Sequence, residues 1–230
     1  MHPSSLNKRG FTLIELLVVI AIMAVIATVG VPSLFSLTKS NQMNQATSEL
    51  QGLLEQARQY AVAQNTYVWV AFNTQITNNI DTMSIAIVAS MDGSDPGTFG
   101  ISPTPNYTVP STSLNLVSKV RTFQHFQLQI PGSYNFTPPT SLPATPVTGS
   151  ANALTTSATF NIQIPGNADT SAFTQCMQFT PSGQARNSSG PIDIIEFALE
   201  PAQVHTVPNG KNVAIVQVNG LTGQAIVYRK

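Results

Sequence analysis

The sequence contains few of the residues that build catalytic or metal centres. Its 230 residues include one cysteine, Cys176, and three histidines, His2, His125 and His205, which are too far apart to form a recognisable metal-binding motif. The lone cysteine excludes an intramolecular disulfide, and its apolar neighbours predict a buried thiol in a strand. The chain has no glycine-rich phosphate loop and no recognisable pair of nucleophile and base. We therefore expect no catalytic residue, no metal, no cofactor and no enzymatic role.

Charge is scarce as well. Ten Lys and Arg residues balance ten Asp and Glu residues, and charged residues make up only 9% of the chain. A chain this neutral has no broad basic surface to attract nucleic acid, so we expect no nucleic-acid partner. An uncharged and almost wholly apolar segment lies between Glu15 and Lys39, where none of the 23 intervening residues carries a formal charge.

This uncharged segment has the length of a membrane span. At about 1.5 Å per residue its helix would reach roughly 35 Å, whereas a bilayer core is about 30 Å thick. Lys8 and Arg9 precede it and favour a cytoplasmic N-terminus. Near its end lie Gly30 and Pro32, where we expect a kink, because proline removes a backbone hydrogen bond. A plain single-pass anchor fits these observations, with residues 11–35 in the membrane.

The start of the segment is more specific, since residues 8–15 read Lys-Arg-Gly-Phe-Thr-Leu-Ile-Glu. This run resembles the signal of type IV prepilins and type II secretion pseudopilins. The resemblance implies that a prepilin peptidase removes residues 1–10 by cutting between Gly10 and Phe11, and then methylates the new amine. It also implies that Glu15 meets the N-terminal amine of a neighbouring subunit during assembly. A carboxylate in an apolar segment is costly unless paired, which agrees with this role; the alternative is that Glu15 stays hydrated at the membrane interface.

The helical pattern continues beyond the membrane segment, and we expect one helix over residues 11–66, with Asn65 as its stop. Apolar or small residues recur every three or four positions and form a stripe that would pack on a sheet: Met43, Ala46, Leu50, Leu53, Leu54, Ala57, Tyr60 and Ala61. Residues 53–65 resemble the Leu-x-x-Ala-Arg-x-x-Ala segment of GspH/FimT-like minor pseudopilins. Arg58 is then either a partner-binding cation or a surface residue paired locally with Glu55.

After the helix the hydrophobic pattern changes to a period of two, typical of strands. Residues 219–223 predict a hairpin loop. The fold class is therefore α+β, with the helix packed on an antiparallel sheet in a β-rich domain over residues 67–230. The expected strands cover residues 67–72, 83–89, 119–130, 158–164, 173–179, 192–199, 213–218 and 224–228.

Two proline-rich connections, residues 94–113 and 131–157, interrupt this pattern, and we expect both to lie on the surface without regular strands. At the start of the first of them, Asp92 and Asp95 stand in an Asp-Gly-Ser-Asp-Pro-Gly run over residues 92–97. Such a run fits either a simple turn or oxygen ligands for calcium, which some major pseudopilins bind.

The C-terminal part extends the resemblance. Residues 179–183 resemble the Phe-x-Pro-x-Gly segment between strands of the GspH-like domain, and residues 213–230 resemble its closing hairpin. Gln224 and Ala225 stand where that family often has arginine, which weakens any DNA-binding role borrowed from the competence-associated FimT branch. The whole chain is also similar to prepilin-type members of the Verru_Chthon cassette.

Together these resemblances imply a minor pseudopilin or pilin-like subunit of a type II secretion pseudopilus or type IV pilus-like filament, with a role in protein transport. The implied partners are the prepilin peptidase, other pseudopilins or pilins, and the inner-membrane assembly platform. The precursor would span the inner membrane once, with its C-terminal domain in the periplasm. Two alternatives stay open: a tip minor pilin that binds DNA or a surface ligand, and a membrane-anchored β-domain that does not assemble.

Overall fold

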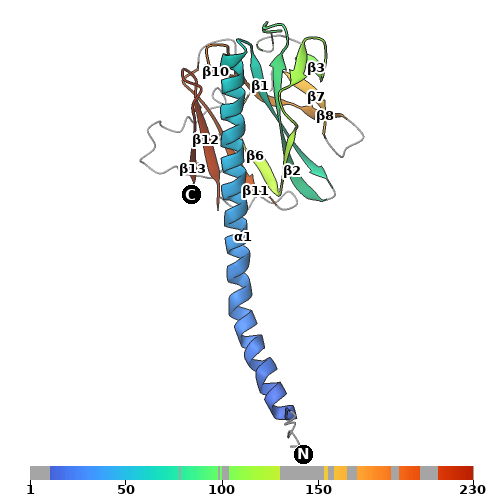
Figure 1. Cartoon of the computed structure of the whole chain (residues 1–230), viewed down its shortest axis with the longest axis vertical. Helices are drawn as coiled ribbons and strands as arrows, with labels where there is room; N and C mark the ends of the chain where they lie inside the picture. Colours follow the sequence, from blue (N-terminus) through green and yellow to red (C-terminus); the bar gives the residue numbers. More distant parts are fainter. Residues whose placement is uncertain are drawn as a thin grey trace, which may run out of the picture. The chain divides into compact units, whose positions relative to one another are not determined.

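The computed structural model describes residues 11–77, 79–97, 99, 104–129, 153–154, 158–164, 170–187, 192–202 and 212–229, with the backbone alone over 27–40 and at 77. The fold is α+β: one helix, α1 (Leu13–Ala63), is followed by strands in three mostly antiparallel sheets (Figure 1). The chain forms two compact units, Met1–Gln42 and Met43–Lys230.

The backbone of α1 is helical without interruption through Gly30 and Pro32. The kink expected at these two residues stays a prediction, because their side chains lie outside the described set. Among the residues described with their side chains, no helix is long and apolar enough to cross a membrane.

The second half of α1, from Met43 onward, carries the predicted apolar stripe. Seven of its eight predicted residues are buried, and Tyr60 is partly buried, while Gln42, Gln45, Gln56 and Gln59 are exposed. The helix ends at Ala63, and Asn65, the predicted stop, has a left-handed φ of 50°. The Thr66 amide donates to the Ala61 carbonyl at 3.0 Å and the Asn65 amide to the Val62 carbonyl at 3.4 Å. This is the Schellman arrangement, which satisfies the last free carbonyls of a helix.

The largest sheet, called sheet A here, is built on a long antiparallel hairpin of β1 (Val68–Thr77) and β2 (Ile80–Ser90). Strand β9 pairs with β1, and β4 and β5 both pair with β2. The order is β10-β9-β1-β2-β4, with β4 (Leu114–Leu116), β5 (Arg121–Gln124), β9 (Gln175–Phe179) and β10 (Ala185–Arg186).

Two smaller sheets complete the domain. Sheet B has the order β3-β7-β8, with β3 (Asn106–Val109) parallel to β7 (Thr159–Gln163) and β7 antiparallel to β8 (Thr170–Phe173). Sheet C has the order β13-β12-β11-β6, all antiparallel, with β6 (Phe126–Gln129), β11 (Ile194–Pro201), β12 (Ala214–Asn219) and β13 (Ala225–Arg229).

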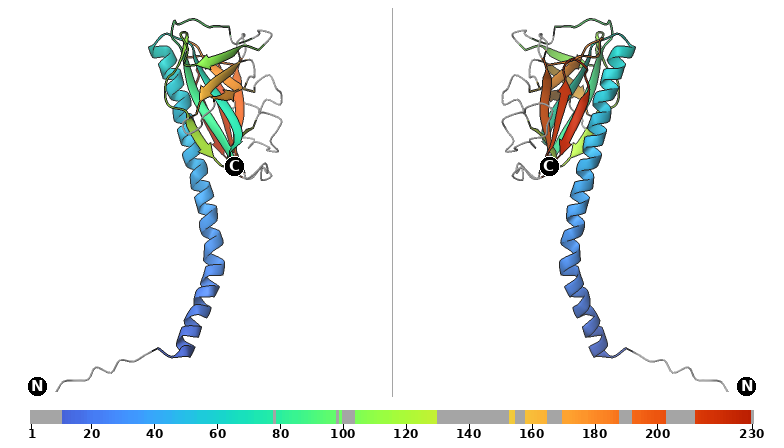
Figure 2. Two further views of the ribbon diagram at one scale, coloured as in Figure 1. Left: turned by 90° about the vertical axis from the view of Figure 1, so that its right-hand side faces the viewer. Right: turned by 90° about the vertical axis from the view of Figure 1, so that its left-hand side faces the viewer.

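The main core lies between α1, sheet A and sheet C. It combines Leu50 and Leu54 of α1 with Phe72 of β1 and Phe197 of β11, whose rings lie 5.3 Å apart. The other face of sheet A forms a second core with sheet B, around Trp69. Figures 1 and 2 show the strands gathered along the second half of α1, with β12 and β13 on one side of it and β1 and β2 on the other. Sheet A is thus buried on both faces, which explains why β2 has no exposed position.

Two predicted strands are each divided in two. The strand expected over residues 119–130 breaks at His125, whose φ is 64°. Before His125 the chain belongs to sheet A as β5, and after it the chain belongs to sheet C as β6. Two hydrogen bonds fix this crossing: the His125 amide donates to the Asp81 carbonyl at 2.7 Å, and the Ala202 amide donates to the His125 carbonyl at 2.8 Å. The strand expected over 173–179 divides at Thr174 into β8 of sheet B and β9 of sheet A. A hydrophobic pattern does not reveal when a strand changes sheets.

The expectation that residues 94–113 form no regular strand was wrong, because β3 lies within them. Pro105 and Pro110 flank this short strand, and β3 is at the edge of sheet B, where the neighbouring prolines break no ladder. Of the second proline-rich connection, residues 131–152 and 155–157 lie outside the described residues, as does His205. The predicted buried thiol is confirmed: Cys176 is fully buried in β9, and burial raises its pKa to about 12.

Candidate functional site

The first residues of α1 are organised around Thr12 and Glu15. The Thr12 amide donates to Glu15 Oε2 at 2.9 Å, and the Thr12 hydroxyl donates to the same oxygen at 3.0 Å. In return the Glu15 amide donates to Thr12 Oγ1 at 3.3 Å. The Thr12 carbonyl also accepts the first bond of the helix, from the Leu16 amide at 3.2 Å. This reciprocal arrangement is a capping box, in which Thr12 is the N-cap and Glu15 the third helical residue.

The capping box leaves Glu15 with two different carboxylate oxygens. Oε2 accepts both bonds from Thr12, whereas Oε1 has no hydrogen-bond donor among the residues that the structure describes. Because the amide groups at a helix N-terminus favour an anion, the carboxylate is held in place by its own helix. The site can therefore accept one further donor, such as an ammonium group, on Oε1 without dismantling the cap.

The sequence contains a signal for this arrangement that charge and hydropathy do not reveal. A Ser or Thr followed three residues later by Glu, just before an apolar run, marks a helix N-terminus, and Thr12-Leu13-Ile14-Glu15 has that form. Of the predicted processing residues, Gly10 lies outside the described set, and Phe11 stands just before the cap, 85% exposed.

The helix beyond the cap presents apolar side chains on all of its faces. Every described side chain from Phe11 to Ile26 is exposed, and they are mostly Leu, Val, Ile and Ala. A continuous apolar surface of this kind marks contact with a membrane or with other protein chains. Glu15 is the one charged side chain on this surface.

A second group of candidate residues meets around Arg58 of α1. Its guanidinium donates from Nη2 to Glu55 Oε1 at 2.8 Å and from Nε to Glu55 Oε2 at 3.1 Å, a two-pronged ion pair that agrees with the local interpretation of this cation. The Glu55 partner raises the pKa of Arg58. Its Nη1 also donates to the Thr222 carbonyl at 3.4 Å, in the hairpin loop between β12 and β13.

This contact joins three stretches that are far apart in the sequence. The predicted hairpin at residues 219–223 is confirmed, with the Gly223 amide on the Asn219 carbonyl at 2.8 Å. The turn over residues 180–183 packs against it, since a Cβ on Gly223 would lie 2.2 Å from the Gly183 carbonyl oxygen and 2.8 Å from Arg58 Cδ. The Arg58 junction, meaning Arg58, Gly183, Thr222 and Gly223, is thus closely packed and structural in character.

The two acidic residues that could supply calcium ligands have separate internal partners. Asp92 Oδ1 accepts bonds from the Ser90 hydroxyl at 2.7 Å and from the amide and hydroxyl of Ser94 at 2.9 and 2.7 Å. These bonds, chiefly those from Ser94, lower the pKa of Asp92 to about 2. The described residues include no group of three or more side chains that could hold a metal. The turn interpretation therefore accounts for Asp92.

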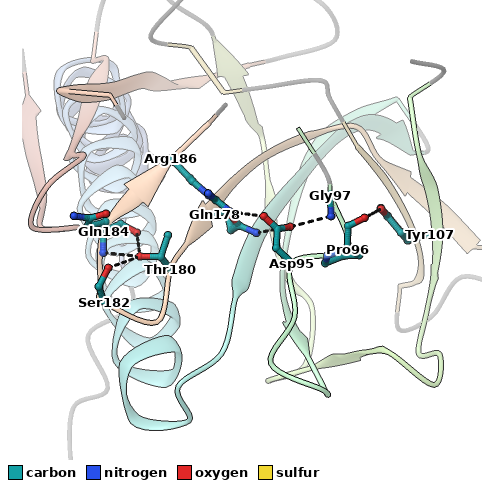
Figure 3. A network of polar contacts seen from close by, with 9 residues as sticks. All are labelled: Asp95, Pro96, Gly97, Tyr107, Gln178, Thr180, Ser182, Gln184 and Arg186. Carbon is teal, nitrogen blue, oxygen red and sulfur yellow. Dashed lines mark hydrogen bonds and ion pairs between the residues drawn. The ribbon is translucent and has the colours of Figure 1, made fainter. Parts of the chain in front are cut away.

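Asp95 belongs instead to a network that ties its loop to sheet A (Figure 3). Its carboxylate forms an ion pair with Arg186 of β10 and accepts a bond from Gln178 of β9 at 3.3 Å. The Arg186 guanidinium also bonds to Gln178 and lies over the rings of Tyr67 and Phe99, 5.3 and 5.6 Å from their centres. These contacts hold the loop around Asp95 against strands β9 and β10 of sheet A.

Comparison with known families bears on the N-terminal site alone. Residues 5–31 match the family described as the prokaryotic N-terminal methylation motif. The motif fits a type IV pilin-like or pseudopilin precursor. Its matched residues contain Phe11, the capping box and the whole exposed apolar surface from Phe11 to Ile26. Neither the curated proteins nor the solved structures gave a match to this chain.

Proposed function

We propose that this chain is a minor pseudopilin or pilin-like structural subunit of a type II secretion pseudopilus or related filament. The observation that carries the proposal is the Thr12–Glu15 capping box directly after the processing site of a methylation motif. In this proposal a prepilin peptidase cuts between Gly10 and Phe11 and methylates the Phe11 amine. The role is structural, and no catalytic step is assigned to the chain.

The proposed location follows from the sequence of the same segment. Residues 11–35 anchor the precursor in the inner membrane, with the N-terminus in the cytoplasm and the β-rich domain in the periplasm. On assembly the apolar surface leaves lipid and is buried among the helices of other subunits. Both environments are apolar, so the transfer changes little for Leu, Val and Ile.

Glu15 is the residue for which the transfer matters. Its Oε1 is available, while Oε2 is held by Thr12, so the methylated amine of a neighbouring subunit can bind there as a charge-assisted hydrogen bond. An unpaired carboxylate in an apolar surrounding is costly, so the pairing favours the assembled state over the isolated subunit. The assembly platform of the inner membrane would deliver the subunits to each other.

The finer assignment to the GspH/FimT-like minor pseudopilins is supported by the Arg58 junction. The helix segment, the turn and the hairpin that resemble this family meet there in space. DNA binding gains no support from the described arginines, because each of them has a polar partner: Glu55 for Arg58, Glu49 for Arg121, Asp95 for Arg186 and Asn212 for Arg229.

The decisive experiment separates processing from assembly with Glu15→Gln, which keeps the shape of the side chain and removes its charge. We expect the variant to be cut normally, with Phe11 at its mature N-terminus by mass spectrometry, but to be nearly absent from sheared filaments. Glu49→Gln is the matched control, because Glu49 lies on the same helix and only pairs with Arg121 at 3.5 Å. Normal incorporation of the Glu15→Gln variant, or a mature protein that still begins at Met1, would reject the proposal.

A further inference from the structure

The end of α1 and the loop after β2 enclose a polar cleft of about 520 Å³, called the Asp92 cleft here. Its lining includes Tyr60, Gln64 and Asn65 on the helix side and Met91, Asp92 and Gly93 on the loop side. Hydrogen bonds join the two sides: the Thr66 hydroxyl donates to the Ser90 carbonyl at 2.8 Å, and the Ser90 amide donates to the Tyr67 carbonyl at 2.9 Å. The cleft is thus built into the unit Met43–Lys230.

Asp92 gives the cleft its charge. It is the one carboxylate among the described lining residues, which include no lysine, arginine or histidine. Its Oδ1 accepts three hydrogen bonds from Ser90 and Ser94, whereas no donor in the described part of the chain reaches Oδ2. These bonds lower the pKa of Asp92 to about 2, so the carboxylate is charged at neutral pH. One carboxylate oxygen therefore remains for a ligand.

The end of α1 adds a second acceptor to the cleft. The amides of residues 64–66 donate to the carbonyls of residues 60–62, and no donor among the described residues reaches the Asn65 carbonyl. This oxygen faces the loop, since a Cβ on Gly93 would lie 3.7 Å from it. The carbonyl end of a helix carries a partial negative charge and favours a cation. The Asn65 carbonyl and Asp92 therefore give the cleft one sign of potential.

We propose that the Asp92 cleft binds a primary ammonium group on an unbranched alkyl chain, which is the chemistry of a lysine side chain. The ammonium donates to Asp92 Oδ2 and to the Asn65 carbonyl, and its third donor is free for the amide oxygen of Gln64. The alkyl chain lies against the ring of Tyr60 and against Met91, which is 59% exposed. This inference uses only the unit Met43–Lys230 and does not rest on the proposed function.

The free acceptors favour an ammonium over a guanidinium. Arginine binds a carboxylate best through two parallel bonds, one to each oxygen. Oδ1 of Asp92 is already occupied by Ser90 and Ser94, so a guanidinium has only Oδ2 to bind. An ammonium is a point charge whose donors can each reach a separate acceptor, and it loses nothing from this arrangement.

A calcium ion fits the same acceptors less well. Calcium takes roughly six to eight oxygen ligands and binds more tightly as the number of carboxylates rises. Asp92 is alone in the lining, because the nearby Asp95 is paired with Arg186. The cleft also has an exposed apolar side chain, Met91, at its edge, which offers nothing to a metal but covers part of an alkyl chain.

The methyl group of Met91 provides a probe inside the cleft. The full-length chain, purified in detergent with ¹³C-methyl methionine, is titrated with Nα-acetyl-lysine methylamide and followed by NMR; Met91→Leu identifies the signal. We expect a saturable shift of the Met91 signal with a dissociation constant in the millimolar range. The norleucine derivative has a similar alkyl chain without the ammonium and should shift the signal little, and the arginine derivative should bind several-fold more weakly. Tighter binding of spermidine than of the lysine derivative would assign the site to a free polyamine, and the reverse to a protein side chain.

Asp92→Asn should weaken binding of the lysine derivative about tenfold or more, because it removes the charge that accepts the ammonium. Asp193→Asn is the matched control, since it removes an exposed carboxylate from a loop outside the cleft and should leave binding unchanged. The comparison of lysine with norleucine needs no variant, so it decides if Asp92→Asn is unstable. Equal shifts from the norleucine or arginine derivative, no saturable shift, unchanged binding by folded Asp92→Asn, or the same shift from calcium chloride at equal ionic strength would overturn the proposal.

Discussion

Gly223 and Gly183 come so close that a side chain on Gly223 would collide with the backbone of the turn at Gly183. A Cβ on Gly223 would lie 2.2 Å from the Gly183 carbonyl oxygen, and both glycines have left-handed backbones, with φ of 67° and 81°. The contact joins the hairpin between β12 and β13 to the turn between β9 and β10, and so joins sheet C to sheet A. Arg58 closes the same junction from α1.

Gly223→Ala should therefore destabilise the protein markedly. The substitution adds a left-handed strain and a clash with fixed backbone, and we expect a loss of about 2 to 4 kcal/mol in the free energy of unfolding. Denaturant unfolding of the detergent-purified full-length chain measures it. Gly52→Ala is the matched control: it lies in α1 with open space around it, and should raise stability by about 0.5 to 1 kcal/mol. Equal stability of the two variants would show that the close contact between Gly223 and the Gly183 carbonyl oxygen does not exist in the folded protein.

The parts of the fold that follow from local rules were predictable from the sequence. The apolar stripe of α1 and its stop at Asn65 depend on residues within a few positions of one another, and both are confirmed. The division of the strand at His125 depends on Asp81 and Ala202, which are far away in the chain, so no local pattern reveals it. The edge position of β13 likewise depends on the order of strands. The candidate site was predictable in part. The Thr-x-x-Glu motif is visible in the sequence, but only the structure shows that both bonds from Thr12 go to Oε2 of Glu15.

Asp92 should make the loop after β2 sensitive to acid. Its pKa is lowered to about 2 from an ordinary value of 3.8, chiefly by the bonds from Ser94. A carboxyl whose pKa is lower in the folded state stabilises that state above its unfolded pKa, and the contribution disappears as the pH falls through the folded value. The stability difference between the native chain and Asp92→Asn should therefore be constant above about pH 5 and shrink between about pH 4 and pH 2.

The measurement is the unfolding midpoint of both chains across that pH range. Asp193→Asn serves as the control. Asp193 lies in another loop, and among the described residues its carboxylate accepts no hydrogen bonds like those that Ser90 and Ser94 donate to Asp92. A difference between native and Asp92→Asn chains that persists unchanged at pH 2, or that grows on acidification, would contradict the role given to the Ser90 and Ser94 bonds.

Thr12 should matter for assembly through Glu15. Thr12→Ala removes the hydroxyl that donates to Glu15 Oε2 and accepts from the Glu15 amide, and leaves only the backbone bond of the cap. Loss of an N-cap side chain typically costs about 1 kcal/mol of helix stability, and here it also frees the carboxylate to rotate. We expect normal cleavage before Phe11 with filament incorporation reduced several-fold, as quantified by immunoblot of sheared filaments against total cell protein. Thr12→Ser keeps the hydroxyl and should behave as the native chain, so a serine variant as defective as the alanine variant would show that the hydroxyl bonds do not position Glu15.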